Sequence, residues 1–546
     1  MPSASDPSAV RDLGPSHPES GAVALRLAPP APRLGLLIPS AGDLIFLLLL
    51  VSLAAGPLAQ KMLGDAGIGW HIRAGELILR TRSVPRVDPF SLTMNGKPWF
   101  AWEWLYDLVV GGLDRAAGLN GVVLFSALVI ALTFALVFRK MLARGSGFGV
   151  AVTMLLLAVS ASSIHFLARP HVVSWLFTVI FFGVLAAFED DGNPRRLLWI
   201  PVIMLVWVNL HGGFLVGLVL VGIWFLAESA KSLGWVGSGE RIASARKAKL
   251  LAVVGALSAA ATLANPYGYH LHEHIYRYLG DRFLMDHIDE FLSPNFHGLA
   301  QKCFAAILLF TIAAAATAPS RLRASELMVV VFAVYSGLYA TRDIPVSSML
   351  LVLVMAPSLS GSLGEWARSS TFGRKQRVRI KRLQDFSGRI GAMESSLQGH
   401  WWPILVVLLG IYAGLQHGRL GSAQVMDAHF DSKRFPVRAV DWSADHGVGE
   451  AMFCPDSWGG YLIYRRYPEM LVVVDDRHDF YGAEYLKNYL KAIRLEPGWE
   501  QALEGMHANW ILVPEASPLA ARLAGMPTWK AVYRDQTAVL FMPVKA

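Results

Sequence analysis

The stretch from Asp65 to Trp104 concentrates side chains that can do chemistry. It holds carboxylates at Asp65 and Glu103, an imidazole at His71 and a guanidinium at Arg73. Carboxylates and imidazoles act as general bases or metal ligands, and a guanidinium binds anions. The stretch follows directly on the first long apolar run of the chain. We therefore expect an enzyme that works at a membrane surface.

The composition indicates a membrane protein. Of the 546 residues, 54% are hydrophobic and 16% are charged, a balance typical of polytopic membrane proteins. The net charge of +8 does not indicate a nucleic-acid partner, because the Lys and Arg residues fall mainly between apolar runs. Cys303 and Cys454 form no metal or redox motif. We expect them to be unpaired, although a bridge between them stays open.

About eleven apolar runs are long enough to be membrane spans. They lie near 44–63, 119–138, 147–165, 172–188, 197–210, 213–229, 250–266, 302–318, 326–340, 344–359 and 401–417. Residues 1–42 are rich in Pro, Ser and Ala and are expected to form a disordered cytoplasmic leader. The sequence thus predicts a polytopic α-helical membrane domain at 43–417, with no cleavable signal peptide before it.

Lys and Arg residues fall on alternate loops, which predicts the orientation of the chain through the positive-inside rule. The cytoplasmic loops then include a basic segment at 361–399, which either lies along anionic headgroups or serves as a solvated linker. The loop at 64–118 lies outside the cytoplasm. Residues 418–546 alternate short apolar runs with helical patterns. That pattern predicts a small extracytoplasmic α/β domain.

Polar side chains gather at the outer ends of the expected spans. They are Arg169, His171, Asn209, His211, Asn265 and Arg342. Polar groups near membrane depth are costly and tend to mark function, so their position at one face predicts a single outward-facing site. A role as a helix-end anchor is the alternative for Arg169 and for His171.

The C-terminal domain offers a second set of candidates. Asp456, Asp476 and Arg477 follow apolar strands, and ligands bind at the carboxyl ends of strands in open α/β sheets. These three side chains are therefore expected to face a common crevice, with turn formation and helix capping by Asp456 as the alternative. Asp88 stands in the sequence Asp-Pro-Phe-Ser, which predicts a turn.

A further pattern has the H-x-x-E-H spacing of a zinc peptidase helix. It is formed by His270, Glu273 and His274, after the seventh expected span. The sequence identifies no third ligand. A histidine-rich interfacial helix is the better interpretation, and a zinc peptidase is the weaker one.

Several motifs together resemble one superfamily. The first outer loop reads D-x-x-x-x-W-H-I-R-x-G-E-x-I-L, followed by V-P-x-x-D-P-F-S and W-x-x-x-E-W-L. Later come R-P-H, W-V-N-L-H-G-G, A-N-P-Y-G and a tail with D-x-W-G-G-Y-L and D-x-R. Over most of the chain after residue 43, these motifs resemble a group of bacterial membrane proteins assigned to the GT-C glycosyltransferase superfamily.

The resemblance implies a multi-pass glycosyltransferase of the bacterial inner membrane. Such an enzyme takes a sugar from a polyprenyl-phosphate-linked donor and passes it to an extracytoplasmic glycan, lipid or protein acceptor, here expected with inversion. Asp65 holds the position of a catalytic base or metal ligand, and Glu103 is a second carboxylate. The loop has no adjacent acidic pair, so a divalent cation, Mg²⁺ or Mn²⁺, stays open.

The same resemblance implies roles for the other candidate residues. Those expected to hold the donor phosphate are Arg169, His171, His211 and Arg342. Those expected to support the site or bind the acceptor are His71, Arg73, Asn209, Asn265, Asp456, Asp476 and Arg477. Membrane lipids are the other expected partners.

A non-catalytic membrane component is the alternative function: a transporter of lipid-linked glycans or an envelope assembly scaffold. A transporter predicts polar groups through the middle of the membrane and internal repeats. The polar groups of this chain lie mainly at one face, which favours the enzyme.

Overall fold

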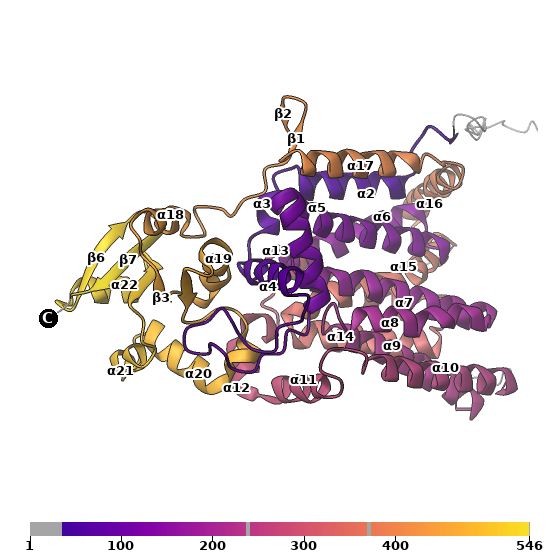
Figure 1. Cartoon of the computed structure of the whole chain (residues 1–546). Coiled ribbons are helices and arrows are strands. Elements are labelled where there is room, and N and C mark those ends of the chain that lie inside the picture. The colour runs from indigo at the N-terminus through magenta and orange to yellow at the C-terminus, as the bar shows by residue number, and fades with distance from the viewer. Residues whose placement is uncertain (1–34, 236–240, 369–372, 545–546) are drawn as a thin grey trace, which may run out of the picture.

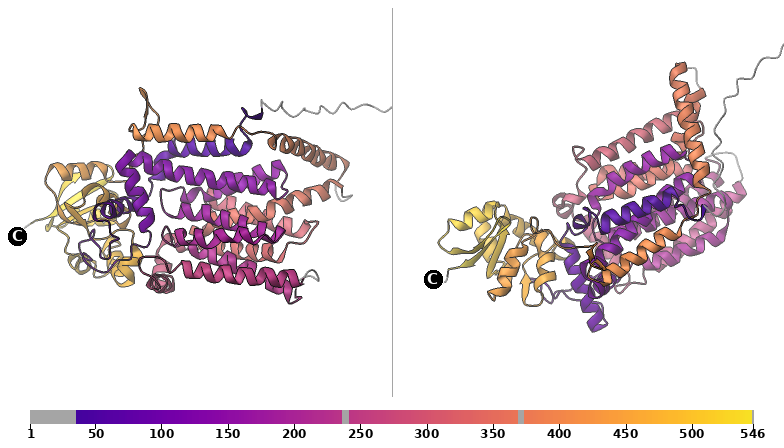
Figure 2. Two further views of the ribbon diagram at one scale, coloured as in Figure 1. Left: turned by 45° about the vertical axis from the view of Figure 1, so that its right-hand side comes forward. Right: turned by 90° about the horizontal axis from the view of Figure 1, so that it is seen from above.

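The computed structural model describes residues 35–235, 241–368 and 373–544. Most of the expected leader, residues 1–34, therefore lies outside the described residues, as do residues 369–372 of the basic segment. Two parts follow one another along the chain: a bundle of apolar helices and a smaller sheet domain at one end of it (Figure 1). Figure 2 shows the same separation from two further directions.

Six helices of the described chain are long and apolar enough to cross a membrane. They are Trp104–Ala143, Phe148–His165, His171–Asp191, Phe214–Ser232, Leu299–Thr317 and Thr341–Arg368. Three shorter apolar helices accompany them: Ala41–Ala54, Ala324–Tyr339 and Trp401–Leu415. The expected multi-pass membrane fold is confirmed. The two other expected spans fall in α8 (Trp199–Trp207) and in the more polar α10 (Arg241–Ala261), so the count of about eleven spans stays a prediction.

The helix labels follow the chain order. The bundle comprises α2 (Ala41–Ala54), α3 (Ala59–Met62), α5 (Trp104–Ala143), α6 (Phe148–Ser162), α7 (His171–Asp191), α8, α9 (Phe214–Ser232), α10, α13 (Leu299–Thr317), α14 (Ala324–Tyr339), α15 (Ile344–Arg368) and α17 (Trp401–Leu415). Four short 3₁₀ helices join them: η1 (Ser163–His165), η2 (Pro194–Leu198), η3 (Asp289–Phe291) and η4 (Thr341–Asp343).

The first part of α5 is separated from the rest by a change of direction at Gly118. There φ is 60° and ψ is −160°, a conformation that essentially only glycine adopts. In Figure 1 the part of α5 before this residue runs across the ends of the bundle helices. This first part, rich in Leu and Val, is the amphipathic stretch for which the sequence predicts a position flat in the membrane interface.

The expected outer loop 64–118 contains a helix that the sequence did not predict. This helix is α4 (Gly67–Thr81), and it buries Ile68, Ile72 and Ile78 on the face toward the rest of the protein. Two further helices lie at the same end of the bundle, α11 (His270–Gly280) and α12 (Arg282–His287). The basic segment instead forms α16 (Arg374–Glu394), at the opposite end (Figure 2).

The C-terminal domain is the small α/β domain predicted from the sequence. Its five strands are β3 (Glu450–Phe453), β4 (Met470–Val472), β5 (Trp510–Pro514), β6 (Trp529–Arg534) and β7 (Ala538–Pro543). Their order in the sheet is β4-β3-β5-β7-β6, with β3 parallel to both of its neighbours. Around them lie α18 (Val437–Asp445), α19 (Asp456–Arg466), α20 (His478–Ile493), α21 (Trp499–Glu504) and α22 (Pro518–Ala524). A short hairpin of β1 (Arg419–Leu420) and β2 (Ala423–Gln424) precedes the domain.

Helix α4 is packed between the bundle and the C-terminal domain through glycines. A Cβ atom on Gly69 would lie 2.1 Å from the carbonyl oxygen of Gly460 in α19. A Cβ atom on Gly75 would lie 1.9 Å from the carbonyl oxygen of Asp107 in α5. Both distances are far below van der Waals contact. Only glycine therefore allows α4 to approach both neighbours so closely.

We expect Gly69→Ala to destabilise the protein by about 1–3 kcal/mol, since the new methyl group overpacks the contact with Gly460. Thermal unfolding in detergent measures the loss. Gly112→Ala in α5 is the matched control, because no atom lies within 4 Å of its Cβ position; it should be neutral or stabilising by up to about 1 kcal/mol. Equal losses at both positions would contradict the close approach of α4 and α19.

Candidate functional site

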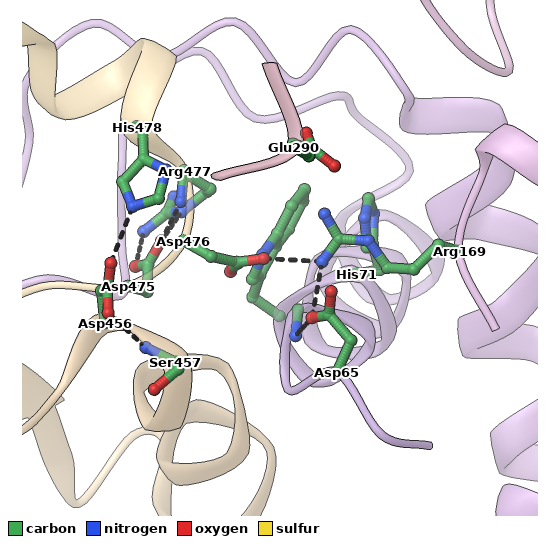
Figure 3. A network of polar contacts seen from close by, with 12 residues as sticks. Asp65, His71, Arg169, Glu290, Asp456, Ser457, Asp475, Asp476, Arg477 and His478 are labelled. Carbon is green, nitrogen blue, oxygen red and sulfur yellow. Dashed lines mark hydrogen bonds and ion pairs between the residues drawn. The ribbon is translucent and has the colours of Figure 1, made fainter. Parts of the chain in front are cut away.

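Arg169 lies between two carboxylates from distant parts of the chain (Figure 3). Its Nη1 is 3.1 Å from Asp65 Oδ1 and 2.6 Å from Asp476 Oδ2. Asp65 directly precedes α4, Arg169 comes just before α7, and Asp476 follows β4. Burial alone would lower the pKa of Arg169, but Asp65 and Asp476 raise it above its ordinary value. The structure thus joins three of the predicted site residues in one cluster.

The glycine that follows Asp65 makes room for this cluster. A Cβ atom on Gly67 would lie 1.5 Å from Arg169 Nη1 and 2.2 Å from Asp476 Oδ2. The Gly67 N–H donates a hydrogen bond of 2.8 Å to Asp65 Oδ1. Both contacts of the Asp65 carboxylate thus use Oδ1, and no contact of Oδ2 is found within the described chain. Asp65 is 35% exposed, so a substrate can reach its second oxygen.

Asp476 is held from a second side by α4. The indole Nε1 of Trp70 donates a 2.8 Å hydrogen bond to Asp476 Oδ1. One side chain of the C-terminal domain therefore bonds to both α4 and the start of α7. This contact supports the expectation that the C-terminal domain contributes to the site.

Arg477, the residue after Asp476, points away from Arg169 and pairs with Asp88 and Asp475. Its side chain is 2% exposed and pairs with Asp88 at 2.7 Å and with Asp475 at 2.6 Å. Burial favours the neutral form, yet the two carboxylates raise the pKa of Arg477 well above its ordinary value. Asp88 also accepts a hydrogen bond from the Ser91 N–H, as its predicted turn requires. Arg477 therefore fastens the outer loop to the C-terminal domain rather than facing an acceptor.

Glu103, the second predicted carboxylate, lies between two imidazoles. Its Oε2 is 3.7 Å from His71 Nε2, and its Oε1 is 3.6 Å from His211 Nε2. The side chain is 12% exposed, and burial raises the pKa of Glu103 to about 8. His71 is fully buried, and its Nδ1 lies 2.6 Å from Asp107 Oδ1. The structure thus assembles a second cluster from α4, α5 and the loop after α8.

The remaining phosphate candidates lie nearby, at the ends of α7 and α15. His171 Nε2 lies 2.9 Å from the carbonyl oxygen of His165. Arg342 Nη1 pairs with Glu290 Oε1 at 3.3 Å. Burial favours the neutral acid, but Arg342 and then His165 lower the pKa of Glu290. The charge of Arg342 is therefore only partly neutralised, by an exposed carboxylate.

Three predicted site residues serve the fold instead. Asn209 accepts from the Trp104 indole and donates to the carbonyl oxygen of Ala264. Asn265 caps its own turn, donating to the Gly268 carbonyl oxygen at 3.0 Å. Arg73 donates through Nε to the carbonyl oxygen near the end of α19, at Tyr464. Asn and Arg are well suited to such backbone contacts, which match a supporting role, one of the two roles expected for these residues; an acceptor role for them stays a prediction.

Asp456 begins α19 and pairs with His478 Nε2 at 2.9 Å. Burial opposes each charged form. The pairing nevertheless lowers the pKa of Asp456 and raises the pKa of His478. Figure 3 shows this pair beside Arg477, with Asp476 extending from there toward Arg169. His478 therefore lies with Asp456, and the common crevice expected for Asp456, Asp476 and Arg477 stays a prediction.

The structure does not form the zinc site that the H-x-x-E-H spacing suggested. Glu273 pairs with Arg277 at 2.6 Å, and His274 turns to Asp479 at 3.0 Å. Within the described ranges, no group of three or more His, Cys, Asp or Glu side chains is placed to hold a metal ion. Between Asp65 and Asp476 the guanidinium of Arg169 occupies the position that a divalent cation would need. As arranged, these side chains do not fit a divalent cation.

Sequence reasoning missed Asp107, Glu290 and His478. One signal was present for Asp107: it follows Glu103 by four residues, so two carboxylates share one helix face. Like charges at this spacing destabilise a helix, so such a pair needs partners from elsewhere. No comparable signal marked Glu290 or His478, whose partners come from distant segments.

Comparison with known proteins finds similarity in structure alone. No protein-family model matches the chain, and no curated protein matches its sequence. The oligosaccharyltransferase of Archaeoglobus fulgidus, tethered to an acceptor peptide, matches with a TM-score of 0.53 at 13% identity, over 87% of this chain and 68% of that one. The same enzyme, AglB, with an inhibitory peptide and dolichol-phosphate, matches with a TM-score of 0.51 at 10% identity, over 87% and 69%. ArnT from Cupriavidus metallidurans, bound to undecaprenyl phosphate, gives 0.45 at 16% identity, over 92% and 98%.

We expect Arg477→Met to destabilise the protein by about 3–5 kcal/mol, because it leaves Asp88 and Asp475 buried without their counter-charge. Thermal or denaturant-induced unfolding in detergent measures the loss of unfolding free energy. Arg522→Met is the matched control. Arg522 is 57% exposed and 4.0 Å from Glu500, so its loss should cost less than about 1 kcal/mol. A similar cost for both variants would show that Arg477 does not hold the two parts together.

Proposed function

We propose that this chain, which has the fold of the GT-C membrane glycosyltransferases, transfers a sugar from a polyprenyl-phosphate donor to an extracytoplasmic acceptor. The single observation that carries the proposal is the Arg169 guanidinium between Asp65 and Asp476. It brings together a cation for a phosphate, an accessible carboxylate for a hydroxyl proton, and a residue of the C-terminal domain. The archaeal oligosaccharyltransferase of the same fold has been captured with dolichol-phosphate and with an acceptor peptide.

Arg169 keeps donors for the phosphate. Both of its ion pairs use Nη1, and no contact of Nη2 or Nε is found in the described chain. A guanidinium has five N–H donors in a planar fork, which suits phosphate oxygens. Arg342 adds a second cation, and we propose His171 and His211 as further neutral donors toward the same group. These residues would stabilise the negative charge that develops on the departing phosphate.

Asp65 is the proposed base. The Oδ2 atom of Asp65 accepts the proton of the acceptor hydroxyl, while the hydroxyl oxygen attacks the anomeric carbon of the sugar. The bond from this carbon to the phosphate oxygen breaks, and the lipid phosphate leaves with the electron pair. One displacement inverts the anomeric carbon. Asp476 and the pair of Asp456 and His478 line the proposed acceptor side, so the C-terminal domain covers it.

We propose that the site lies on the extracytoplasmic side of a bacterial inner membrane. The polar clusters and the C-terminal domain lie at one end of the bundle, and the basic helix α16 lies at the other (Figure 2). Because basic segments remain on the cytoplasmic side, the C-terminal domain is then periplasmic or extracellular. The polyprenyl tail would lie among the apolar helices of the bundle, with its phosphate at their outer ends.

We expect Asp65→Asn to lower the rate of sugar transfer at least about 100-fold, since an amide cannot take up the hydroxyl proton. Membranes that carry each variant and receive a labelled lipid-linked sugar provide the measurement. Asp427→Asn is the control: Asp427 is 75% exposed and pairs only with His429 in the described chain. Full transfer by Asp65→Asn would reject the catalytic role and favour a transporter or an assembly scaffold.

We expect Arg169→Lys to raise KM for the donor at least about tenfold, with a smaller effect on kcat. Lysine keeps the charge but cannot hold two carboxylates and also offer a planar pair of donors. Donor titrations of purified protein separate the two constants. Arg277→Lys, at a side chain that is 75% exposed, should leave both unchanged. An unchanged KM in Arg169→Lys would remove Arg169 from the phosphate site.

A further inference from the structure

The surroundings of the Glu103 carboxyl group suit its neutral, protonated form. Its two oxygens face different imidazoles, at 3.7 Å on the side of His71 and 3.6 Å on the side of His211. Both distances are longer than a hydrogen bond. Each oxygen would form a hydrogen bond if it moved less than about 1 Å closer to its imidazole nitrogen. What each imidazole offers to Glu103 follows from the partner of its other nitrogen.

His211 offers a donor to Glu103. Its Nδ1 lies 3.0 Å from the Gly213 N–H, which donates to it, and the Ser174 hydroxyl lies 2.8 Å from the same nitrogen. An Nδ1 that accepts a hydrogen bond carries no proton, so the neutral ring carries its proton on Nε2. Burial, with Arg342 nearby, holds the pKa of His211 well below its ordinary value and keeps the ring neutral. Glu103 Oε1 therefore faces an N–H group, as a carbonyl oxygen requires.

His71 offers an acceptor on the other side. Its Nδ1 lies 2.6 Å from Asp107 Oδ1, and an Nδ1–H that donates to this carboxylate leaves a lone pair on Nε2. That Nε2 is buried and has no hydrogen-bond partner in the described chain. Burial, with Arg169 nearby, holds the pKa of His71 well below its ordinary value. We assign the proton of the His71–Asp107 contact to Nδ1, and with this tautomer Glu103 Oε2 faces a lone pair, as a hydroxyl group requires.

The surroundings of Glu103 explain why neutrality matters. The charged and titratable groups around Glu103 are His71 on α4, Tyr106 and Asp107 on α5, Arg169 before α7, His211 after α8, Tyr278 on α11, Arg342 on η4, and Asp476 and Asp479 from the C-terminal domain. Arg169 and Arg342 are the two cations proposed to bind the donor phosphate. An ionised Glu103 beside them would compete for the cations and repel the phosphate.

We infer that the phosphate of the lipid donor binds only when Glu103 carries a proton, so that phosphate binding and proton binding are coupled at this carboxyl. The inference rests on the proposed function, because it concerns the same phosphate site. Above the pH at which Glu103 ionises, a binding phosphate draws one proton from solvent onto Glu103. Glu103 is then a binding residue of the donor site, and Asp65 is the carboxylate that accepts the acceptor proton.

The coupling predicts how donor affinity depends on pH. With burial raising the pKa of Glu103 to about 8, the carboxyl is protonated at pH 7 and largely ionised at pH 9. If only the protonated form binds phosphate, the affinity falls about tenfold between these two values. The sugar-linked donor is a phosphodiester, whose single charge does not titrate over this range. The polyprenyl monophosphate that leaves is a monoester with a second pKa near 6, so it stays doubly charged over the same range.

Binding of a polyprenyl monophosphate to the full-length protein in detergent tests the coupling by calorimetry at pH 7 and pH 9. We expect wild-type affinity to fall about tenfold, and heats measured near pH 8.5 in buffers of different ionisation enthalpy to show uptake of a proton. Glu103→Gln should bind with the same affinity at both pH values and about tenfold more tightly than wild type at pH 9. Its amide matches the neutral acid, because the NH₂ group faces His71 and the carbonyl oxygen faces His211.

Glu273→Gln is the control, since it makes the same substitution at a side chain that is 43% exposed. It should keep the wild-type fall in affinity. A wild-type fall in Glu103→Gln, or weaker binding than wild type at pH 9, would overturn the inference and leave the proposed function standing. No binding by wild-type protein at pH 7 would instead overturn the proposed donor class.

Discussion

The close approach of α4 to two other helices is the constraint on which the rest of the structure depends. Gly75 lets α4 touch the backbone of α5, and Gly69 lets it touch the backbone of α19. Neither contact leaves room for a side chain, so the helix has almost no freedom to slide or rotate. The residues of α4 are thereby fixed relative to both the membrane bundle and the C-terminal domain. His71 reaches Asp107 of α5, and Trp70 reaches Asp476 of the C-terminal domain.

The two buried or partly buried arginines have different functions despite similar partners. Arg477 is enclosed by aromatic rings and by two carboxylates, so its charge is neutralised by buried partners inside the protein. Taking such a cluster out of water is costly, and its effect is to select one arrangement rather than to add net stability. Arg169 has the same two-carboxylate pattern but is 22% exposed and uses one nitrogen for both. Its other donors remain available to a ligand.

The sequence predicted the parts of this architecture that depend on local pattern. Apolar runs marked the helices, alternate basic loops predicted which polar groups share a face, and Asp65 and Arg169 were both expected there. It did not predict α4, although the apolar residues of this helix, among them Ile68, Ile72 and Ile78, recur at helical spacing and bury one face. Nor did it predict that Asp88 pairs with Arg477, 389 residues later in the chain. Such pairs depend on how the C-terminal domain docks, which no local pattern contains.

The comparison of Asp65 with Glu103 shows how one functional group acquires two roles. Asp65 accepts hydrogen bonds from a backbone N–H and from a guanidinium. Glu103 is only 12% exposed and lies near two neutral imidazoles, one of which presents a donor and the other an acceptor. That pattern suits a protonated acid and disfavours the charge. We propose that these different environments make Asp65 the proton acceptor and Glu103 the carboxyl group that keeps its proton. The position of α4 decides the separation, because Asp65 lies two residues before this helix and His71 lies in its second turn.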